Sequence, residues 1–172
     1  MAIVMDDPDS PFGFVERRFW HPMNIVIERL GSSDRSEARR LFSMLAEAFD
    51  EKRDLLSDAY LDQLLCREDF WALAAFVGDD IVGGVTAHTL PMTRQESSEM
   101  FVFDIAVRSD HRKKGIGRRL LETLSKRASE AGIRELFLAA ENADEHALEF
   151  YRRLGGVATP ATVFVFSTRK EP

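Results

Sequence analysis

The 172-residue chain contains a single cysteine, Cys66, and no long apolar run. One cysteine cannot form a disulfide within the chain, which is typical of proteins from a reducing compartment. Cys66 follows YLDQLL, an apolar stretch with helical spacing, so we expect a buried and unreactive thiol. No stretch approaches the roughly 18 apolar residues that a membrane span requires. The amino terminus is acidic where a secretory signal is basic, and we therefore expect a cytoplasmic protein.

The chain has no excess of positive charge, because 29 acidic residues outnumber 23 basic ones and give a net charge of −6. Phosphate neutralisation supplies most non-specific affinity for nucleic acid, so nucleic acid is a poor partner for this chain. A cationic partner fits better. The four histidines are scattered and form no cluster with metal-ligand spacing, so no metal is expected.

The composition is 45% hydrophobic and 30% charged, which suits one soluble globular domain. Prolines and a glycine interrupt residues 1–23, which we interpret as an N-terminal extension. The aromatic residues of this extension are suited to packing on the domain or on a second subunit, which leaves a homodimer open. The domain itself is expected to span residues 24–172.

Hydrophobic periodicity predicts an alternation of helices and strands in this domain. We expect a strand at residues 25–28, a helix with its apolar stripe between residues 38 and 49, and a shorter helix whose stripe includes Tyr60 and Leu61. WALAAFV and IVGGVTAH flank a tight-turn signal and predict a β-hairpin. After a polar loop at residues 91–98, MFVFDIAV predicts a further strand.

The second half of the domain begins with a helix over residues 115–131, which Gly132 is expected to end. A short strand, ELFLAA, is followed by a helix over residues 144–154 that stops at Gly155 and Gly156. TVFVFST is expected to close the chain as a strand. The predicted order is β-α-α-β-β-β-α-β-α-β.

The stretch FVFDIAVRSDHRKKGIGRRLL carries the clearest chemical signal. An apolar strand leads into a basic loop, then two glycines, then an amphipathic helix. Unpaired amides at the start of a helix, at the positive end of its dipole, bind anions such as a pyrophosphate. The surrounding cations are Arg112, Lys113, Lys114, Arg118 and Arg119. A turn with a solvated basic face would look similar, and the third glycine of a dinucleotide fingerprint is missing.

At this stretch the chain resembles the GNAT family of acetyltransferases. Residues 112–117, RKKGIG, match the family's R/Q-x-x-G-x-G/A signature, and Ala147, Tyr151, Leu154 and Gly155 match its later motif. The resemblance covers residues 25–168. It implies an α/β fold, more narrowly α+β, with a mixed and mostly antiparallel sheet flanked by about four helices. It also implies acetyl-CoA as cosubstrate, with the coenzyme pyrophosphate held by amides of the signature, whose residues include Gly115, Ile116 and Gly117.

Within the family, the chain is similar to aminoglycoside acetyltransferases that act on the 3-amino group. YLDQLL, FWALAAF, FVFDIAV followed by HRKKGIG, and the acidic AAENADEHALEFYRRLG carry this similarity. The chain departs from the pattern at Ile105, where leucine is usual, and at Gly156, where a large apolar residue is usual. The N-terminal extension has no counterpart in the pattern.

Asp104 is the candidate base for the transfer, because it is the lone charge in an apolar strand. Burial would raise the pKa of its carboxyl and favour proton acceptance near neutrality. A carboxylate bonded to a backbone amide at a bulge is the structural alternative. The resemblance favours contact with the substrate amine.

The resemblance assigns the other roles. The backbone of Ile105, Ala106 and Val107 would hold the pantetheine arm where the strand separates from its neighbour, and a β-bulge is a means to that end. Tyr151 would protonate the leaving thiolate, although a core tyrosine is the alternative. An acidic group would dock the cationic amine, or else form a solvated helix start: Glu141, Asp144 and Glu145.

Three functions remain open at this level. The leading one is an aminoglycoside 3-N-acetyltransferase that confers antibiotic resistance. The second is a GNAT enzyme for another amine, such as a polyamine, a small metabolite or a protein amino terminus. The third is a non-catalytic coenzyme A sensor, against which the presence of Asp104 and Tyr151 argues.

Overall fold

A computed structural model describes residues 24–52 and 55–168 of the chain. The extension expected over residues 1–23 lies outside this part. The described residues form nine main elements, in the order β1 Ile25–Arg29, α1 Arg35–Ala48, α2 Asp58–Leu65, β2 Phe70–Val77, β3 Asp80–Pro91, β4 Ser98–Val107, α3 Ile116–Glu130, β5 Ile133–Phe137 and α4 Glu145–Arg153. This order is the predicted one up to the last helix.

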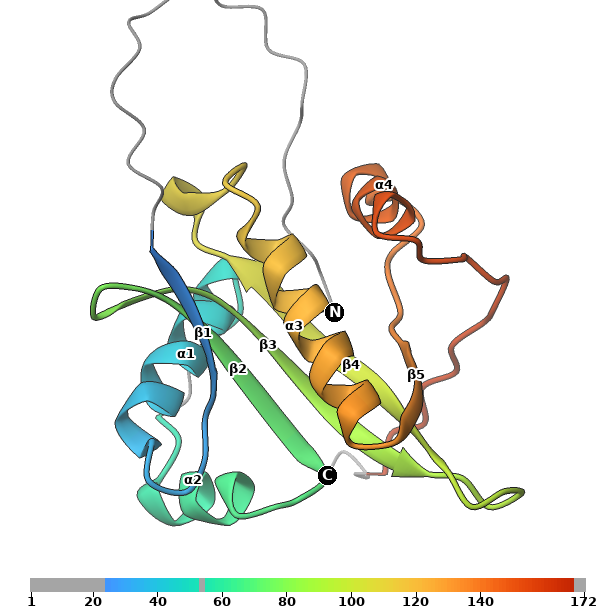
Figure 1. Ribbon diagram of the computed structural model, residues 1–172, viewed down its shortest axis with the longest axis horizontal. Helices are drawn as coiled ribbons and strands as arrows, with labels where there is room; N and C mark the ends of the chain where they lie inside the picture. Colours follow the sequence, from blue (N-terminus) through green and yellow to red (C-terminus); the bar gives the residue numbers. More distant parts are fainter. Residues whose placement is uncertain (1–23, 53–54, 169–172) are drawn as a thin grey trace, which may run out of the picture.

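The strands form one sheet in the order β1-β2-β3-β4-β5 (Figure 1). The first three pairings are antiparallel, and β4 pairs with β5 in parallel through the crossover helix α3. The mixed, mostly antiparallel sheet and its four helices confirm the predicted α+β class. Parallel neighbours need such a crossover, because a tight turn reverses the direction of the chain and would make the next strand antiparallel.

Two apolar cores lie on opposite faces of the sheet. On one face, Leu120 and Leu124 of α3 pack against β-strand residues such as Met100. On the other, Leu41 of α1 packs with residues of α2 and β2. Helix α1 approaches so closely that a Cβ atom on Gly84 of β3 would lie 2.1 Å from Leu41 Cδ1. The same Cβ atom would lie 2.9 Å from the backbone oxygen of Leu73, which cannot move aside easily, so glycine is required at position 84 of this apolar strand.

Local signals end the helices where the sequence predicted. Gly132 follows α3 with a φ of 76° and Gly155 follows α4 with a φ of 89°, and both angles lie in the left-handed region that favours glycine. Helix α2 begins at Ser57, whose hydroxyl accepts a hydrogen bond of 3.2 Å from Tyr60 N.

The strand predicted for TVFVFST is wrong. Residues 157–168 form no helix or strand, and Phe164 and Phe166 are 76% and 84% exposed. Apolar and β-branched residues indicate β propensity, but a strand also needs a neighbouring backbone and a face to cover.

The expected burial of Cys66 is also wrong, because the thiol is exposed. Leu61 and Leu65 are the buried residues of α2, whereas Cys66 forms its C-cap. One residue corresponds to about 100° of rotation around a helix, so Cys66 turns away from the buried stripe. Tyr60 also lies off the stripe and is half exposed. Within the described residues, no helix combines the length and the apolar character that crossing a membrane requires.

Candidate active site

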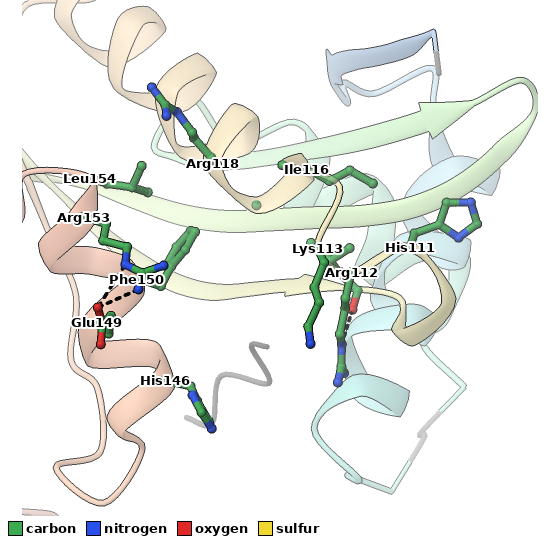
Figure 2. A pocket seen from close by; sticks show the side chains of 13 residues that line it. His111, Arg112, Lys113, Ile116, Arg118, His146, Glu149, Phe150, Arg153 and Leu154 are labelled. Atoms are coloured by element: carbon green, nitrogen blue, oxygen red, sulfur yellow. Dashed lines mark hydrogen bonds and ion pairs between the residues drawn. The ribbon is translucent and has the colours of Figure 1, made fainter. Parts of the chain in front are cut away.

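A cavity of about 320 Å³ opens between the loop before α3 and helix α4 (Figure 2). It brings together two segments that are distant in sequence. One wall comes from the end of β4, the loop and the first turn of α3, and the other from α4. The lining residues are Val107, His111, Arg112, Lys113, Gly115, Ile116, Gly117, Arg118, His146, Glu149, Phe150, Arg153 and Leu154.

The backbone of the loop is shaped for an anion. Lys113 has a φ of 60° and Gly115, the N-cap of α3, has a φ of 76°. Closely spaced left-handed residues turn consecutive amides toward one concave side. The backbone bond from Arg119 N to Gly115 O is 3.1 Å long, so the amides of residues 116–118 precede the helical ladder. These amides lie at the positive end of the α3 dipole.

The cationic side chains of the loop differ in what they contact. Arg112 Nε donates a 3.1 Å hydrogen bond to Val107 O, which ties the loop to the end of β4. Lys114 Nζ donates to Asp110 O at 2.9 Å, and Lys114 is not among the residues that line the cavity. Arg112 and Lys113 project from the loop in the same direction, whereas Arg118 extends from α3 on the other side (Figure 2). Two of the predicted cations therefore also organise the loop.

Asp110 anchors the start of this loop. Its Oδ1 atom accepts a 2.7 Å bond from Arg108 Nε and lies 2.9 Å from His111 Nδ1. The hydrogen bonds with Arg108 and His111 hold the pKa of the Asp110 carboxyl far below its usual range. The sequence analysis missed this arrangement, although RSDH presents the three side chains within four residues.

Strand β4 loses its β5 neighbour halfway along. The parallel pairing ends at Phe101 and Phe137, while β4 continues to Val107 on its β3 side. The register between β3 and β4 also shifts between Thr86 and Ala87, which makes Phe103 an extra residue. The strand thus has a bulge at Phe103 on its β3 side, two residues before the segment 105–107 for which one was suggested.

Of the three β4 residues predicted to contact the coenzyme, Val107 lines the cavity. Ile105 and Ala106 are buried, one in each core, so their side chains hold the strand between α3 and α1. Any contribution from these two residues would come from their backbone groups.

Asp104 lies in the part of β4 that has no β5 neighbour. Thr86 Oγ1 donates a 2.9 Å hydrogen bond to Asp104 Oδ2, and the two residues are paired across β3 and β4. Burial raises the pKa of the Asp104 carboxyl, and the bond from Thr86 partly opposes this increase. Glu51, after α1, is close enough to raise the same pKa further. Thr86 was missed, although a polar residue inside the apolar run VGGVTAH was the available signal.

Tyr151 lies on α4 and packs against the α3-side core. Its hydroxyl is buried and has no hydrogen-bond partner among the described residues. Burial raises the pKa of this hydroxyl, with a smaller contribution from the charge of Asp144. Tyr151 is not among the residues that line the cavity, whereas its neighbour Phe150 is.

The acidic residues expected to dock the substrate lie before and at the start of α4. Asp144 is the N-cap, and its Oδ1 atom accepts a 2.9 Å hydrogen bond from Ala147 N. Glu141 and Glu145 are exposed. None of the three lines the cavity. Asp144 therefore has a structural role in starting the helix.

The α4 wall of the cavity contributes residues that the sequence analysis did not assign to it. Glu149 and Arg153 form an ion pair of 2.8 Å one turn apart, next to Phe150 (Figure 2). His146 lies near the start of the helix. Opposite charges four residues apart are common on any solvent-exposed helix face, so nothing in the sequence specifically indicated that Glu149 and Arg153 line a cavity.

The chemistry of the cavity suits a phosphorylated ligand with an extended arm. Unpaired helix-start amides and basic side chains fit a pyrophosphate. The unpaired edge of β4 presents backbone groups to an amide-containing arm. Coenzyme A carries both groups, so these residues fit it. No cluster of three or more metal-binding side chains occurs in the part of the chain that the structure describes.

Comparison with known proteins agrees with this geometry. The sequence profile described as the acetyltransferase (GNAT) family matches residues 38–156. No curated relative matches the chain in sequence.

Solved structures of two aminoglycoside acetyltransferases from uncultured soil metagenomic samples are similar to the chain. HMB0005 is 30% identical, with a TM-score of 0.81 over 86% of this chain and 100% of that one. The enzyme meta-AAC0020, solved with trehalose and with sisomicin, is 28% identical, with a TM-score of 0.80 over 85% and 97%.

A ribosomal-protein-alanine N-acetyltransferase from Brucella melitensis biovar Abortus 2308 is also similar in structure. It is 26% identical, with a TM-score of 0.65 over 83% of this chain and 99% of that one. Members of the matched family use acetyl-CoA. The five-stranded mixed sheet, the four helices and the family match together establish that the chain belongs to the GNAT family of acetyltransferases.

Proposed function

We propose that the protein is an aminoglycoside 3-N-acetyltransferase, which transfers an acetyl group from acetyl-CoA to the 3-amino group of the deoxystreptamine ring and so confers antibiotic resistance. The observation that carries the proposal is the half-buried Asp104 carboxylate, which lies where β4 loses its β5 neighbour. The similarity to two aminoglycoside acetyltransferases supports the substrate class. A cytoplasmic location, with which the single cysteine agrees, belongs to the same proposal.

The cosubstrate supplies the acetyl group as a thioester, and the loop before α3 would hold its phosphates. The amides of residues 115–118 would bind the pyrophosphate, with added charge from Arg112, Lys113, Lys114 and Arg118. Arg112 would act from a fixed position because its Nε atom is bonded to Val107 O. The backbone of residues 105–107 would hold the pantetheine arm along the unpaired edge of β4.

Asp104 would act on the amine. An ammonium group must lose a proton before its nitrogen can attack a thioester, and a carboxylate with a raised pKa accepts that proton more effectively near neutrality. Thr86 keeps the carboxylate oriented through its 2.9 Å hydrogen bond. Asp104 and Thr86 face the side of the sheet that carries α1, whereas the cavity lies by α3 and α4. The amine would therefore approach the thioester across the edge of β4 that has no β5 neighbour.

Tyr151 would donate a proton to the departing thiolate. Its buried hydroxyl lacks a partner among the described residues, and such a group usually needs an explanation. The hydroxyl is protonated at ordinary pH, as a donor must be, while the pKa raised by burial makes it a weaker acid than a free tyrosine. A thiolate formed nearby would supply the missing acceptor.

The acids before and at the start of α4 would attract the polycationic substrate. Glu141 and Glu145 are exposed, so their attraction would be weak and screened by salt. Asp144 would combine this role with capping α4. Glu51, which follows α1, would also attract the substrate. This role has more direct support than that of the α4 acids, because the charge of Glu51 acts on Asp104 and raises its pKa.

A GNAT enzyme for another amine is the second candidate. The similarity to a ribosomal-protein-alanine N-acetyltransferase favours a protein amino terminus within this alternative. Exposed carboxylates suit a basic peptide or a polyamine as well as an aminoglycoside.

A substrate panel with acetyl-CoA tests the proposal. Aminoglycosides, polyamines and short peptides would be compared by the release of free thiol, and the product would be analysed by NMR. We expect turnover of aminoglycosides and a product acetylated on the 3-amine. Acetylation at another position would contradict the 3-N assignment, and turnover of peptides or polyamines alone would favour the second candidate.

A further inference from the structure

A row of aromatic rings crosses the sheet on the face that carries α1 and α2. Phe70 of β2 lies opposite His88 of β3, His88 lies opposite Phe101 of β4, and Phe101 lies opposite Phe137 of β5. The ring centroids of Phe70 and His88 are 5.2 Å apart, and those of Phe101 and Phe137 are 5.3 Å apart. These distances are close to the strand spacing of about 4.8 Å, so the rings of β2 and β3 lie side by side, as do those of β4 and β5.

Phe103 extends this row at the bulge. As the extra residue of β4, it places its ring 6.2 Å from the ring of His88 and 5.9 Å from that of Phe101, edge-on to both. A regular strand would direct Phe103 and Asp104 to opposite faces. Because of the bulge, both side chains project from the same face of the sheet.

One end of the row is buried and the other is open. Phe70 is buried beside Phe42 of α1, with ring centroids 6.2 Å apart. Phe103 and Phe137 remain 51% and 42% exposed in the described part of the chain. Exposed apolar surface beside polar groups commonly marks a binding site. The row therefore continues beyond the cover of α1 as a surface of rings on β4 and β5.

The open part of the row adjoins the candidate base. Thr86 and His88 are two residues apart on β3 and so point to the same face, and Thr86 is bonded to Asp104. Glu51 is within electrostatic reach of Asp104 from the end of α1. The surface thus combines carboxylates at one end with aromatic faces along its length, which is complementary to a cation with apolar ring faces.

We propose that His88, Phe101, Phe103 and Phe137 form a binding site for the saturated, amine-bearing rings of a multi-ring substrate, next to the ring whose amine meets Asp104. This inference rests on the proposed function. Aromatic faces attract ammonium groups and also pack against the C–H faces of saturated rings. Continuity with Asp104 argues for the substrate as the occupant, because a ligand anchored at the carboxylate has this surface within reach of its remaining rings.

Two alanine variants, at Phe137 and at Phe103, test the site. KM would be measured for a three-ring aminoglycoside and for 2-deoxystreptamine alone. We expect Phe137→Ala to raise KM for the three-ring substrate about threefold and the double variant to raise it about tenfold, with KM for the single ring little changed. Phe137→Ala is the more specific single variant, because Phe103 is adjacent to Asp104 in the sequence and its replacement also affects the surroundings of the candidate base.

Matched controls separate the row from general effects. Phe166→Ala removes a ring that is 84% exposed outside the row and should leave both KM values unchanged. Phe103→Leu keeps an apolar side chain but removes the aromatic face, so it should raise KM for the three-ring substrate less than Phe103→Ala does. Circular dichroism and coenzyme affinity would verify that each variant is folded.

Three results would overturn the inference while leaving the proposed function intact. These are unchanged KM values in both alanine variants, an equal rise for the single-ring and three-ring substrates, or a dimer that Phe137→Ala converts to monomer in sedimentation. The last result would mean that a second copy covers the row. Absence of aminoglycoside turnover by the unaltered protein would instead contradict the proposed function, and this inference with it.

Discussion

Thr86 Oγ1 donates a 2.9 Å hydrogen bond to Asp104 Oδ2, and the two residues face each other across β3 and β4. Thr86 is 5% exposed, so the bond is largely shielded from water. A bond to a carboxylate stabilises the charged form and lowers its pKa, which opposes the increase caused by burial. The pair therefore sets the pH at which the candidate base becomes active.

The pH dependence of catalysis should follow this pair. Asp104 must be ionised to accept a proton, so kcat/KM should fall as pH decreases through its raised pKa. Thr86→Val removes the bond that lowers this pKa, and the acidic limb of the profile should move to higher pH. Thr86→Ser keeps the hydroxyl and serves as the control. The substrate's own titration is common to all three proteins, so an unmoved limb in Thr86→Val would contradict the link.

The phosphate-binding role of the loop can be tested with two glycines of similar geometry. Gly115 and Gly78 have φ angles of 76° and 58°, and a Cβ atom on either would have no atom within 4 Å. Alanine in a left-handed conformation costs about 1–2 kcal/mol, so Gly115→Ala and Gly78→Ala should lower the free energy of unfolding similarly.

Coenzyme affinity should separate the same two variants. Calorimetric titration should give a weaker Kd for coenzyme A in Gly115→Ala alone, because only Gly115 lines the cavity. Equal affinity in both variants would mean that the loop does not hold the phosphates.

Tyr151→Phe removes a hydroxyl that has no partner in the described part of the chain. If the hydroxyl protonates the leaving thiolate, kcat should fall about a hundredfold while the substrate KM stays constant. The melting temperature should not decrease, since no hydrogen bond within the described residues is lost. A normal kcat would leave Tyr151 as a core residue, and a change confined to KM would make it a binding residue.

Substrate attraction by the α4 acids should depend on ionic strength. Asp144→Asn removes the charge but keeps an oxygen that can cap α4, and Glu145→Gln removes a second charge without affecting the cap. The double variant should raise the KM for an aminoglycoside and weaken its dependence on salt, with kcat nearly unchanged. An unaltered KM and salt dependence would remove these acids from the substrate site.

The sequence predicted most of the fold because local patterns determined it. The apolar stripe of α3 and the left-handed glycines after α3 and α4 lie where periodicity and capping rules put them. The strand prediction for TVFVFST was wrong because strand pairing depends on the path of the chain after α4, which the local sequence pattern does not encode. The burial prediction for Cys66 was wrong because neighbouring positions at the end of a helix can differ completely in exposure, as Leu65 and Cys66 do.

The candidate site was predictable where one segment carries it. The loop at residues 112–118 is a contiguous signal, and Asp104 was visible as the lone charge of an apolar strand. The α4 wall and the Thr86–Asp104 bond join residues that are distant in sequence, so they became apparent only from the folded chain. The aromatic row likewise depends on register across four strands.

The most direct test of the account is the kcat/KM of Asp104→Asn for an aminoglycoside between pH 6 and pH 9, with coenzyme affinity measured in parallel. Asparagine preserves the size of the side chain and an acceptor for Thr86, but it cannot take up the proton. We predict that kcat/KM falls at least about a hundredfold, the scale of a lost general base, while the Kd for coenzyme A is unchanged. Near-normal turnover across this range would make Asp104 a structural residue and contradict the proposed mechanism.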